Sequence, residues 1–207
     1  MDNDSAVVLS PVHGDRDYEL LAEWCTSRAG VYASGTHQNL SPTDIQRIIE
    51  QGPASFLMVR ANGSAVGAVH WERLTYAGSY KAGSIIGDPE LWGSGFGLDS
   101  LRLLMEFLFH AQNAHRIQVT AGIFNKAMVE FFCSGLLRLE GVLRDYYFLD
   151  GEYHDAVIGS LLRDEYYALV DAYQIVPPNT ISEGEKEQAR KLLLEHLALH
   201  PIKISRK

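Results

Sequence analysis

The sequence has few cysteines, no long apolar run and no surplus of basic residues. Its two cysteines, Cys25 and Cys133, lie far apart and lack the spacing of metal ligands, so we expect reduced thiols as in a cytoplasm. No segment reaches the roughly 18 continuous apolar residues of a membrane helix. The apolar run within residues 1–10 is too short for a signal peptide. These features predict a soluble cytoplasmic protein.

The formal net charge is −8. Proteins with broad affinity for nucleic acid usually carry a basic surplus, so the charge argues against such a partner, although a local basic patch stays compatible with it. Hydrophobic residues make up 46% of the chain and charged residues 21%, which is ordinary for a soluble globular protein. A chain of 207 residues is most simply one domain, here with an appendage.

Apolar periodicity and turn signals predict a mixed α/β domain. Asn62-Gly63 and Asp150-Gly151 are hairpin signals, and the glycine, serine, threonine and asparagine residues of 30–40 indicate a mobile loop. Helices are expected at 17–28, 41–52 and 98–112, with another opening near residue 125. Strands are expected at 7–9, 55–60, 65–74, 80–87, 116–123, 141–149 and 153–163.

The chain changes character at Pro177-Pro178. Ser182 followed by Glu185 is a capping-box pattern, and the residues that form one apolar stripe behind it are Ala189, Leu192, Leu193 and Leu197. We therefore divide the chain into a domain at 1–173 and an extension at 174–207 with an amphipathic helix. Helices of this kind more often pack on their own domain or on a second subunit, which would make a homodimer, than bind a separate partner.

The segment W-G-S-G-F-G, Trp92 to Gly97, has three glycines at alternate positions just before a predicted helix. Glycine there costs conformational entropy, so either a ligand approaches the backbone or the chain makes a tight turn. Backbone N–H groups at a helix N-terminus can cradle an anion. A dinucleotide site fits poorly because the next strand ends without a carboxylate. A P-loop fits worse because no Gly-Lys-Ser/Thr follows.

Residues 88–97, D-P-E-L-W-G-S-G-F-G, resemble the pyrophosphate-binding stretch of the GNAT superfamily of N-acetyltransferases. The closest likeness is to the subgroup of ribosomal-protein alanine N-acetyltransferases. Other segments agree in order and spacing, namely His115-Arg116, Phe124-Asn125, residues 140–144 and residues 150–155. The resemblance covers residues 7–168. It implies a mixed α/β fold with a central, mostly antiparallel twisted sheet, a splayed parallel strand pair and flanking helices.

The resemblance also implies an enzyme that transfers an acyl group from acetyl-coenzyme A, or another acyl-coenzyme A, to a primary amine of a small molecule or peptide. No metal is implied. The backbone of the glycine loop would hold the pyrophosphate, and Asn125 would help to hold the pantetheine arm or orient the thioester. The residues expected to bind this co-substrate are Trp92, Gly93, Ser94, Gly95, Phe96, Gly97, Asn125 and Phe132.

The sequence departs from the family where catalytic groups are usual. Ala82 stands in place of a common Glu base, Phe132 in place of a Tyr acid, and Ser94 in place of a Lys beside the phosphates. The tetrahedral oxyanion needs N–H donors, expected around Ser84 to Ile86, so Ser84 is a catalytic candidate. Glu72, with His70 on the same face of its strand, is our candidate base, the alternative being two solvated strand residues.

Contacts to the acceptor amine are expected from His37, Trp71, Tyr146 and His154. Two other functions stay open. One is acyl transfer from an unusual donor, such as a longer acyl-coenzyme A, a carrier-protein thioester or an aminoacyl-tRNA. The other is a catalytically silent protein that binds acyl-coenzyme A or serves in an assembly.

Overall fold

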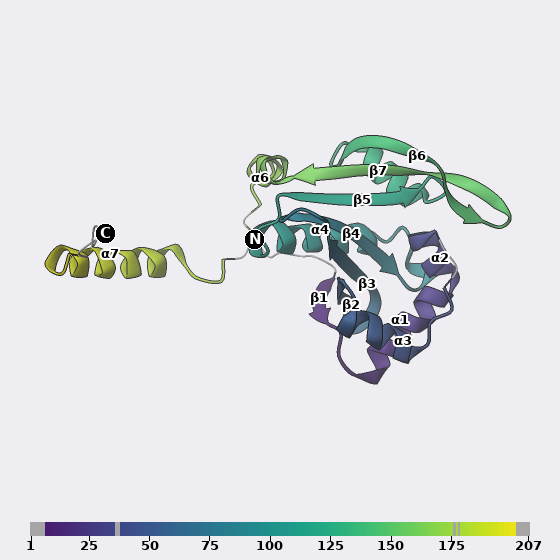
Figure 1. The fold of residues 1–207 in the computed structure, drawn as a ribbon, viewed down its shortest axis with the longest axis horizontal. Helices are drawn as coiled ribbons and strands as arrows, with labels where there is room; N and C mark the ends of the chain where they lie inside the picture. The colour runs from purple at the N-terminus through teal and green to yellow at the C-terminus, as the bar shows by residue number, and fades with distance from the viewer. Residues whose placement is uncertain (1–6, 36–37, 176, 178, 202–207) are drawn as a thin grey trace, which may run out of the picture.

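The computed structural model describes residues 7–35, 38–175, 177 and 179–201. Seven strands form one sheet in the order β1-β2-β3-β4-β5-β7-β6 (Figure 1). All neighbouring strands are antiparallel except β4 and β5, which are parallel. This confirms the predicted mixed α/β fold. The strands are β1 (Val8–Pro11), β2 (Ala54–Ala61), β3 (Ser64–Arg73), β4 (Ser79–Ile86), β5 (Arg116–Gly122), β6 (Arg138–Leu149) and β7 (Glu152–Leu162).

Both predicted hairpins are confirmed by their backbone angles. Asn62 and Gly63 have φ of 49° and 80° between β2 and β3, and Asp150 and Gly151 have φ of 52° and 86° between β6 and β7. Two consecutive residues with positive φ form the turn whose twist matches that of paired strands, and Asn-Gly and Asp-Gly adopt it readily. Local sequence therefore sets these two strand pairings.

The helices are α1 (Gly14–Thr26), α2 (Arg28–Ser34), α3 (Pro42–Gln51), α4 (Phe96–Glu106), α5 (Lys126–Cys133), α6 (Arg163–Ala172) and α7 (Glu183–Leu199), with a short 3-10 helix η1 (Pro89–Leu91) and a π-helical turn η2 (Phe107–Ala111). Helix α3 begins as predicted, with a capping box between Ser41 and Asp44. The loop prediction for residues 30–40 was wrong in its first half, because α2 lies there. Helix α6 was not predicted.

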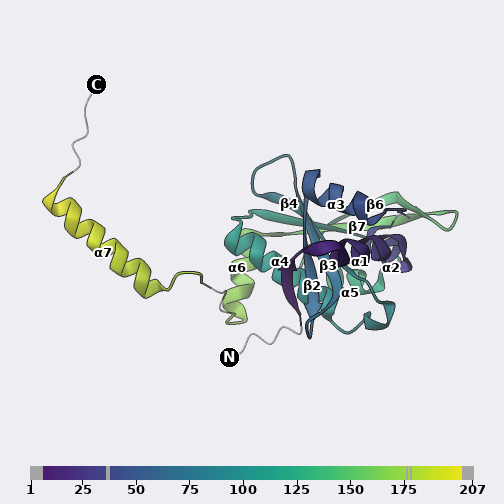
Figure 2. The ribbon, with the colours of Figure 1, turned by 90° about the horizontal axis from the view of Figure 1, so that it is seen from below.

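Helices pack on both faces of the sheet (Figure 2). On one face, α1 and α3 bury a cluster against β2 and β3, built from Leu21, Ala22, Trp24, Ile45, Met58 and Ala68. On the other face, α4, α5 and α6 bury a larger cluster that includes Leu101, Leu104, Leu108, Phe132 and Val170. Burying apolar surface on both faces stabilises the central strands and fixes their relative positions.

Strands β4 and β5 separate partway along their length. They pair only where Ser79–Lys81 of β4 lies beside Arg116–Gln118 of β5. Beyond Lys81, β4 stays paired with β3 up to Ile86 while its other edge is free of β5. This is the splayed parallel pair that the sequence predicts, and it leaves backbone groups of β4 without a strand partner.

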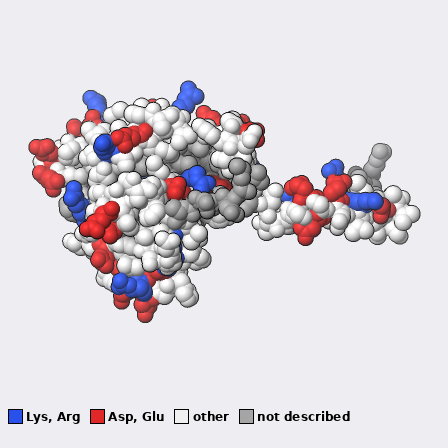
Figure 3. All heavy atoms as spheres, turned by 180° about the vertical axis from the view of Figure 1, so that it is seen from behind, with Lys and Arg blue, Asp and Glu red and all other residues white. Residues whose placement is uncertain are grey.

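Helix α7 begins at the predicted capping box of Ser182 and Glu185. None of its residues is buried, and several of its leucines are largely exposed, for example Leu192 at 68% and Leu199 at 78%. Figure 3 shows charged side chains of both signs on it. In this structure α7 therefore does not pack on its own domain. Its contact with a second subunit stays a prediction. No helix among the described residues is long and apolar enough to cross a membrane.

Candidate active site

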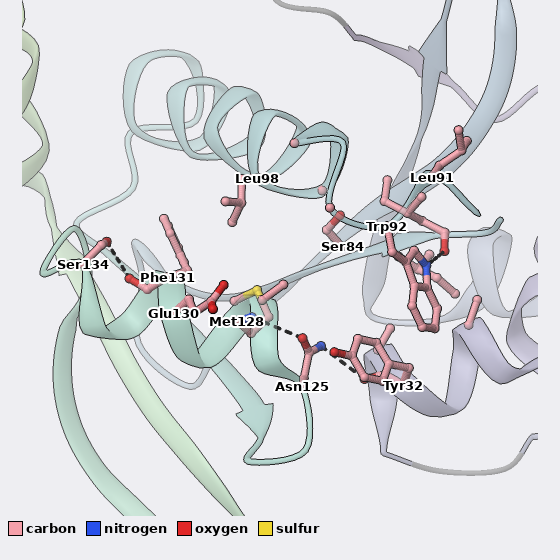
Figure 4. Close-up of a pocket in the computed structure, with 18 of the residues that line it drawn as sticks. Tyr32, Ser84, Leu91, Trp92, Leu98, Asn125, Met128, Glu130, Phe131 and Ser134 are labelled. Carbon is pink, nitrogen blue, oxygen red and sulfur yellow. Dashed lines mark hydrogen bonds between the residues drawn. The ribbon is translucent and has the colours of Figure 1, made fainter. Parts of the chain in front are cut away.

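A cavity of about 460 Å³ opens where β4 and β5 separate. Five segments meet there: the end of β4, the glycine loop, the start of α4, helix α2 and helix α5 (Figure 4). Its wall is mostly apolar, and Glu130 is the one charged residue among its described lining residues. The lining residues used below are Tyr32, Ser84, Ile86, Trp92, Gly93, Gly95, Asn125, Phe131 and Ser134.

The glycine loop lines the cavity with backbone atoms, because Gly93 and Gly95 have no side chain. Gly93 and Gly95 have φ of 82° and 93°, a conformation that residues with a side chain rarely adopt, and a Cβ on either would meet no atom within 4 Å. Gly95 is the N-cap of α4 and offers no side chain to its first N–H groups. The N–H of Phe96 donates to Oγ of Ser94 at 3.4 Å, so the N–H groups of Gly97 and Leu98 remain for a ligand, at the positive end of the helix dipole.

Trp92 joins the glycine loop to two other parts of the wall. Its indole Nε1 donates a hydrogen bond of 3.1 Å to the carbonyl oxygen of Ile86. Its ring stacks on that of Tyr32, with centroids 4.5 Å apart. The guanidinium of Arg28 lies 5.8 Å from the Trp92 ring centroid, which places one positive charge beside a loop whose own residue 94 is a serine.

The free edge of β4 presents backbone donors to the gap. The N–H of Gly87 bonds to Val66 on β3. Because successive backbone groups of a strand point to opposite sides, the N–H groups of Ser84 and Ile86 point away from β3, toward the gap. The family resemblance implies these N–H groups as donors to an oxyanion, and this role stays a prediction.

The Ser84 side chain belongs to a short hydrogen-bonded chain. Its Oγ lies 2.9 Å from Oγ of the fully buried Ser100, which donates to the carbonyl of Gly97 at 2.9 Å. Since Ser100 has a single hydroxyl proton, Ser84 is the donor to Ser100 when Ser100 bonds to Gly97. This arrangement ties β4 to the first turn of α4.

Asn125 caps α5 and also binds α2. Its Oδ1 accepts from the N–H of Met128 at 3.2 Å, and its Nδ2 donates to the carbonyl of Tyr32 at 3.3 Å. The Tyr32 hydroxyl accepts a hydrogen bond of 3.1 Å from the N–H of Lys126. Asn125 is 7% exposed, so its amide is held rigidly at the cavity wall.

Phe132 lies elsewhere than the sequence analysis predicts. Its side chain is 5% exposed and packs in the core against Gly159, where a Cβ would lie 2.7 Å from the Phe132 ring. Phe131 lines the cavity in its place. The helix turns about 100° per residue, so a shift of one position along α5 moves a side chain from the cavity into the core.

The candidate bases lie on the α1 and α3 side of the sheet, outside the cavity lining. The His70 ring lies on Gly83 of β4, where a Cβ would be 2.4 Å from Cε1, and stacks with Phe56 at 5.7 Å. Burial, with the nearby charge of Lys81, lowers the pKa of His70 to about 4. Glu72 is two residues further along the same face, opposite Lys81.

The predicted acceptor contacts are scattered. Trp71 faces the opposite side of the sheet from His70 and packs edge-on against Phe107, with centroids 5.6 Å apart. Tyr146 and His154 lie on the β6–β7 hairpin, where His154 packs on Phe124 with ring centroids 5.7 Å apart. His37 lies outside the described residues.

Sequence reasoning missed the contribution of α2, above all Tyr32. A signal was present: Ser27 bonds to the N–H of Ala29 as the helix N-cap, and Gly35 ends the helix with φ of 71°. The intervening residues are compatible with one short helix between a serine and a glycine. The abundance of small polar residues in 30–40 obscured it.

Among the described residues, no group of three or more His, Cys, Asp or Glu side chains could hold a metal ion. The arrangement offers an anion cradle, a channel beside a free strand edge and N–H donors within it. These features fit a long donor that carries a diphosphate at one end and a reactive carbonyl at the other.

Comparison with known proteins gives one curated relative, the uncharacterized N-acetyltransferase p20 of Bacillus licheniformis. It is 32% identical over 75 residues, which span 36% of this chain and 42% of the relative. A crystal structure of spermidine N-acetyltransferase from Vibrio cholerae in complex with CoA and spermine superposes with a TM-score of 0.70 and 19% identity, covering 79% of this chain and 99% of that one.

A GCN5-related N-acetyltransferase from Brucella melitensis superposes with a TM-score of 0.65 and 18% identity over 88% of each chain. These structural matches share the fold. Residues 7–132 match the family described as the acetyltransferase (GNAT) domain. The chain therefore belongs to the GNAT acetyltransferase family.

Proposed function

We propose that this protein transfers the acetyl group of acetyl-coenzyme A to a primary amine of a small molecule or peptide. One observation carries the proposal: a single cavity runs from the positive-φ glycines to the free edge of β4. This cavity would connect a site for a diphosphate to a site for a reacting carbonyl. Membership of the GNAT acetyltransferase family supports it, as does the likeness to the spermidine N-acetyltransferase solved with CoA and spermine.

The donor would lie along β4. Backbone N–H groups of residues 93–97 would hold the pyrophosphate, with Arg28 supplying a positive charge at the Trp92 edge. The amide of Asn125 borders the cavity near the expected pantetheine arm. The carbonyl would meet the N–H groups of Ser84 and Ile86, which stabilise the oxyanion as the amine attacks.

The amine must be neutral before it attacks, because an ammonium with a pKa of roughly 10 has no free electron pair. The low pKa of His70 keeps its imidazole neutral at pH 7, so it can accept a hydrogen bond from the amine but takes up a proton weakly. Glu72 is about 7 Å further along the strand from His70 and would act through bridging water. We therefore keep Glu72 as the base and assign His70 to orienting the acceptor.

The function is tested by incubating the full chain with acetyl-coenzyme A and a panel of amines. The panel contains spermidine, an aromatic monoamine and a peptide with N-terminal alanine, and products are detected as a mass increase of one acetyl group together with free thiol. Parallel reactions with longer acyl-coenzyme A donors test the choice of donor. Tight donor binding without product from any amine would instead favour a catalytically silent binding protein.

The role of Glu72 is tested with Glu72→Gln. The control is the same exchange at an exposed strand residue, Glu152→Gln on the β6–β7 hairpin. Glu72→Gln should lower kcat at least roughly tenfold at pH 7 and leave the donor dissociation constant nearly unchanged. Higher pH should partly restore the rate, since the amine then loses its proton unaided. Unchanged turnover from pH 6 to 9 would make Glu72 a solvated strand residue.

A further inference from the structure

Three hydroxyl groups line the cavity among the described residues: those of Tyr32, Ser84 and Ser134. Two of these protons are already engaged. Ser134 donates to the carbonyl of Phe131 at 2.7 Å. Ser84 donates to Ser100 when Ser100 donates to Gly97. Glu130, the one carboxyl group among the described lining residues, pairs with the ammonium of Lys126 at 3.6 Å.

Tyr32 differs from the two serines. Its oxygen accepts a hydrogen bond from the N–H of Lys126 at 3.1 Å, and its own O–H proton has no acceptor among the described residues. The ring is fixed between Trp92 and Phe124, at centroid distances of 4.5 and 6.4 Å. Figure 4 shows Tyr32 beside Asn125 at one end of the cavity, with Ser84 on the opposite wall. The phenol oxygen of Tyr32 is thus held in a fixed position at the cavity wall and carries a proton that it can donate.

We propose that Tyr32 is the acid that protonates the departing thiolate, an assignment that rests on the proposed function. The amine nitrogen forms a bond to the thioester carbonyl carbon and gives its proton to the base. Collapse of the tetrahedral adduct breaks the carbon–sulfur bond, and the sulfur takes the Tyr32 proton. Water then returns a proton to the phenolate oxygen. The N–H of Lys126 stabilises that oxygen while it is negatively charged.

The side chains of α5 explain why a residue of α2 would supply this proton. On α5, both Phe131, which lines the cavity, and Phe132, which lies in the core, lack a hydroxyl. Helix α2 reaches the same end of the cavity through its bonds to Asn125 and Lys126. The proton source would therefore come from a segment more than 90 residues away along the chain, since Tyr32 and Lys126 are 94 apart.

The test compares wild type with Tyr32→Phe, which keeps the ring on Trp92 and removes only the hydroxyl. Turnover is followed with acetyl-coenzyme A and an amine on which the wild type is active, across pH 6 to 10. We expect kcat to fall at least about tenfold, with the donor dissociation constant within twofold of wild type. In a second protein, 3-fluorotyrosine at position 32 keeps every contact and makes the phenol more acidic. It should move the alkaline limb of the kcat profile to lower pH.

A placement control moves the hydroxyl to the other helix. In the Tyr32→Phe background, Phe131→Tyr puts a phenol on the cavity wall of α5, and recovery of kcat would support the acid role. Tyr76→Phe, at a tyrosine 79% exposed, should change nothing. Wild-type kcat and an unmoved alkaline limb in both Tyr32 proteins would overturn the assignment alone. Failure of the wild type with every amine would overturn the proposed function and the assignment with it.

Discussion

The two walls of the cavity are built in different ways. The β4 wall runs from Ser84 through the glycine loop to Ser100, and its internal bonds join residues at most 16 apart in sequence. The α2–α5 wall joins Tyr32 to Asn125 and Lys126, which are 93 and 94 residues away. The first wall is largely local, whereas the second forms only after the sheet has brought distant segments together.

This difference separates what each wall contributes. The β4 wall offers backbone N–H groups, which depend on glycine and strand geometry rather than on side-chain identity. The α2–α5 wall offers side chains, among them Tyr32 and Asn125. We infer that changes in the β4 wall mainly alter donor binding, and that changes in the α2–α5 wall alter stability and the chemical step.

The largest effect should come from acid acting on His70 of β3, which belongs to neither wall and packs against Gly83 of β4. Burial, then the charge of Lys81, lowers the pKa of His70 to about 4, against about 6.5 in an unfolded chain. Between these values the unfolded state binds a proton that the folded state does not. The contribution of His70 to the free energy of unfolding is therefore fully present above about pH 6.5. Up to about 3 kcal/mol of it is lost as the pH drops to 4.

Urea unfolding at pH 4, 5, 6 and 7 measures this dependence, with His70→Gln as the comparison. The variant lacks the titrating imidazole, so its stability should change less with pH over that range. The same pH slope in both proteins would show that another group is responsible.

Gly95→Val should give the next largest effect, and on donor binding. The valine would have to adopt a φ near 93°, which costs on the order of 1–3 kcal/mol. We expect acetyl-coenzyme A affinity, measured by calorimetry, to fall about ten- to a hundredfold. Gly63→Val is the matched control, because its φ of 80° and its empty surroundings are similar but it lies in the β2–β3 turn. Equal affinity in wild type and folded Gly95→Val would place the diphosphate elsewhere.

Tyr32→Ala tests the long-range wall through stability. It removes the stack on Trp92 and the partner of the Lys126 N–H, and we expect the free energy of unfolding to fall by about 1–2 kcal/mol. Tyr76→Ala, at an exposed tyrosine, should cost under about 0.5 kcal/mol in the same denaturant titration. If the two variants lose equal stability, α2 is not held by Tyr32.

The smallest effect should come from changing the charge beside the glycine loop, and it concerns the affinity for acetyl-coenzyme A. Ser94→Lys adds a cation beside the expected diphosphate and should tighten acetyl-coenzyme A about two- to fivefold, more so at low salt. Arg28→Gln removes the cation over Trp92 and should weaken binding by a similar factor. Calorimetry at two salt concentrations measures both. Identical dissociation constants in all three proteins would mean that the phosphates lie away from this edge.

The fold was accessible from the sequence because its signals are local. Asn62-Gly63 and Asp150-Gly151 predicted the hairpins, Ser41 followed by Pro42 predicted the start of α3, and the family resemblance was confirmed over residues 7–132. The likeness to the ribosomal-protein alanine subgroup stays a prediction. Helix α2 was missed because it is short, and its glycine and serine are as typical of a loop as of a short helix that tertiary contacts stabilise.

The sequence by itself determined the β4 wall. Glycines, which adopt a φ of 82° to 93° without a side-chain clash, lie between a strand and a helix and produce the cradle wherever that segment folds. Only the tertiary structure decided which side chains face it. The packing of α5 turns Phe131 rather than Phe132 to the cavity, and the docking of α2 brings Tyr32 to Lys126 across 94 residues. The physical reason is that a backbone conformation follows from neighbouring residues, whereas contact between distant side chains depends on how the whole core packs.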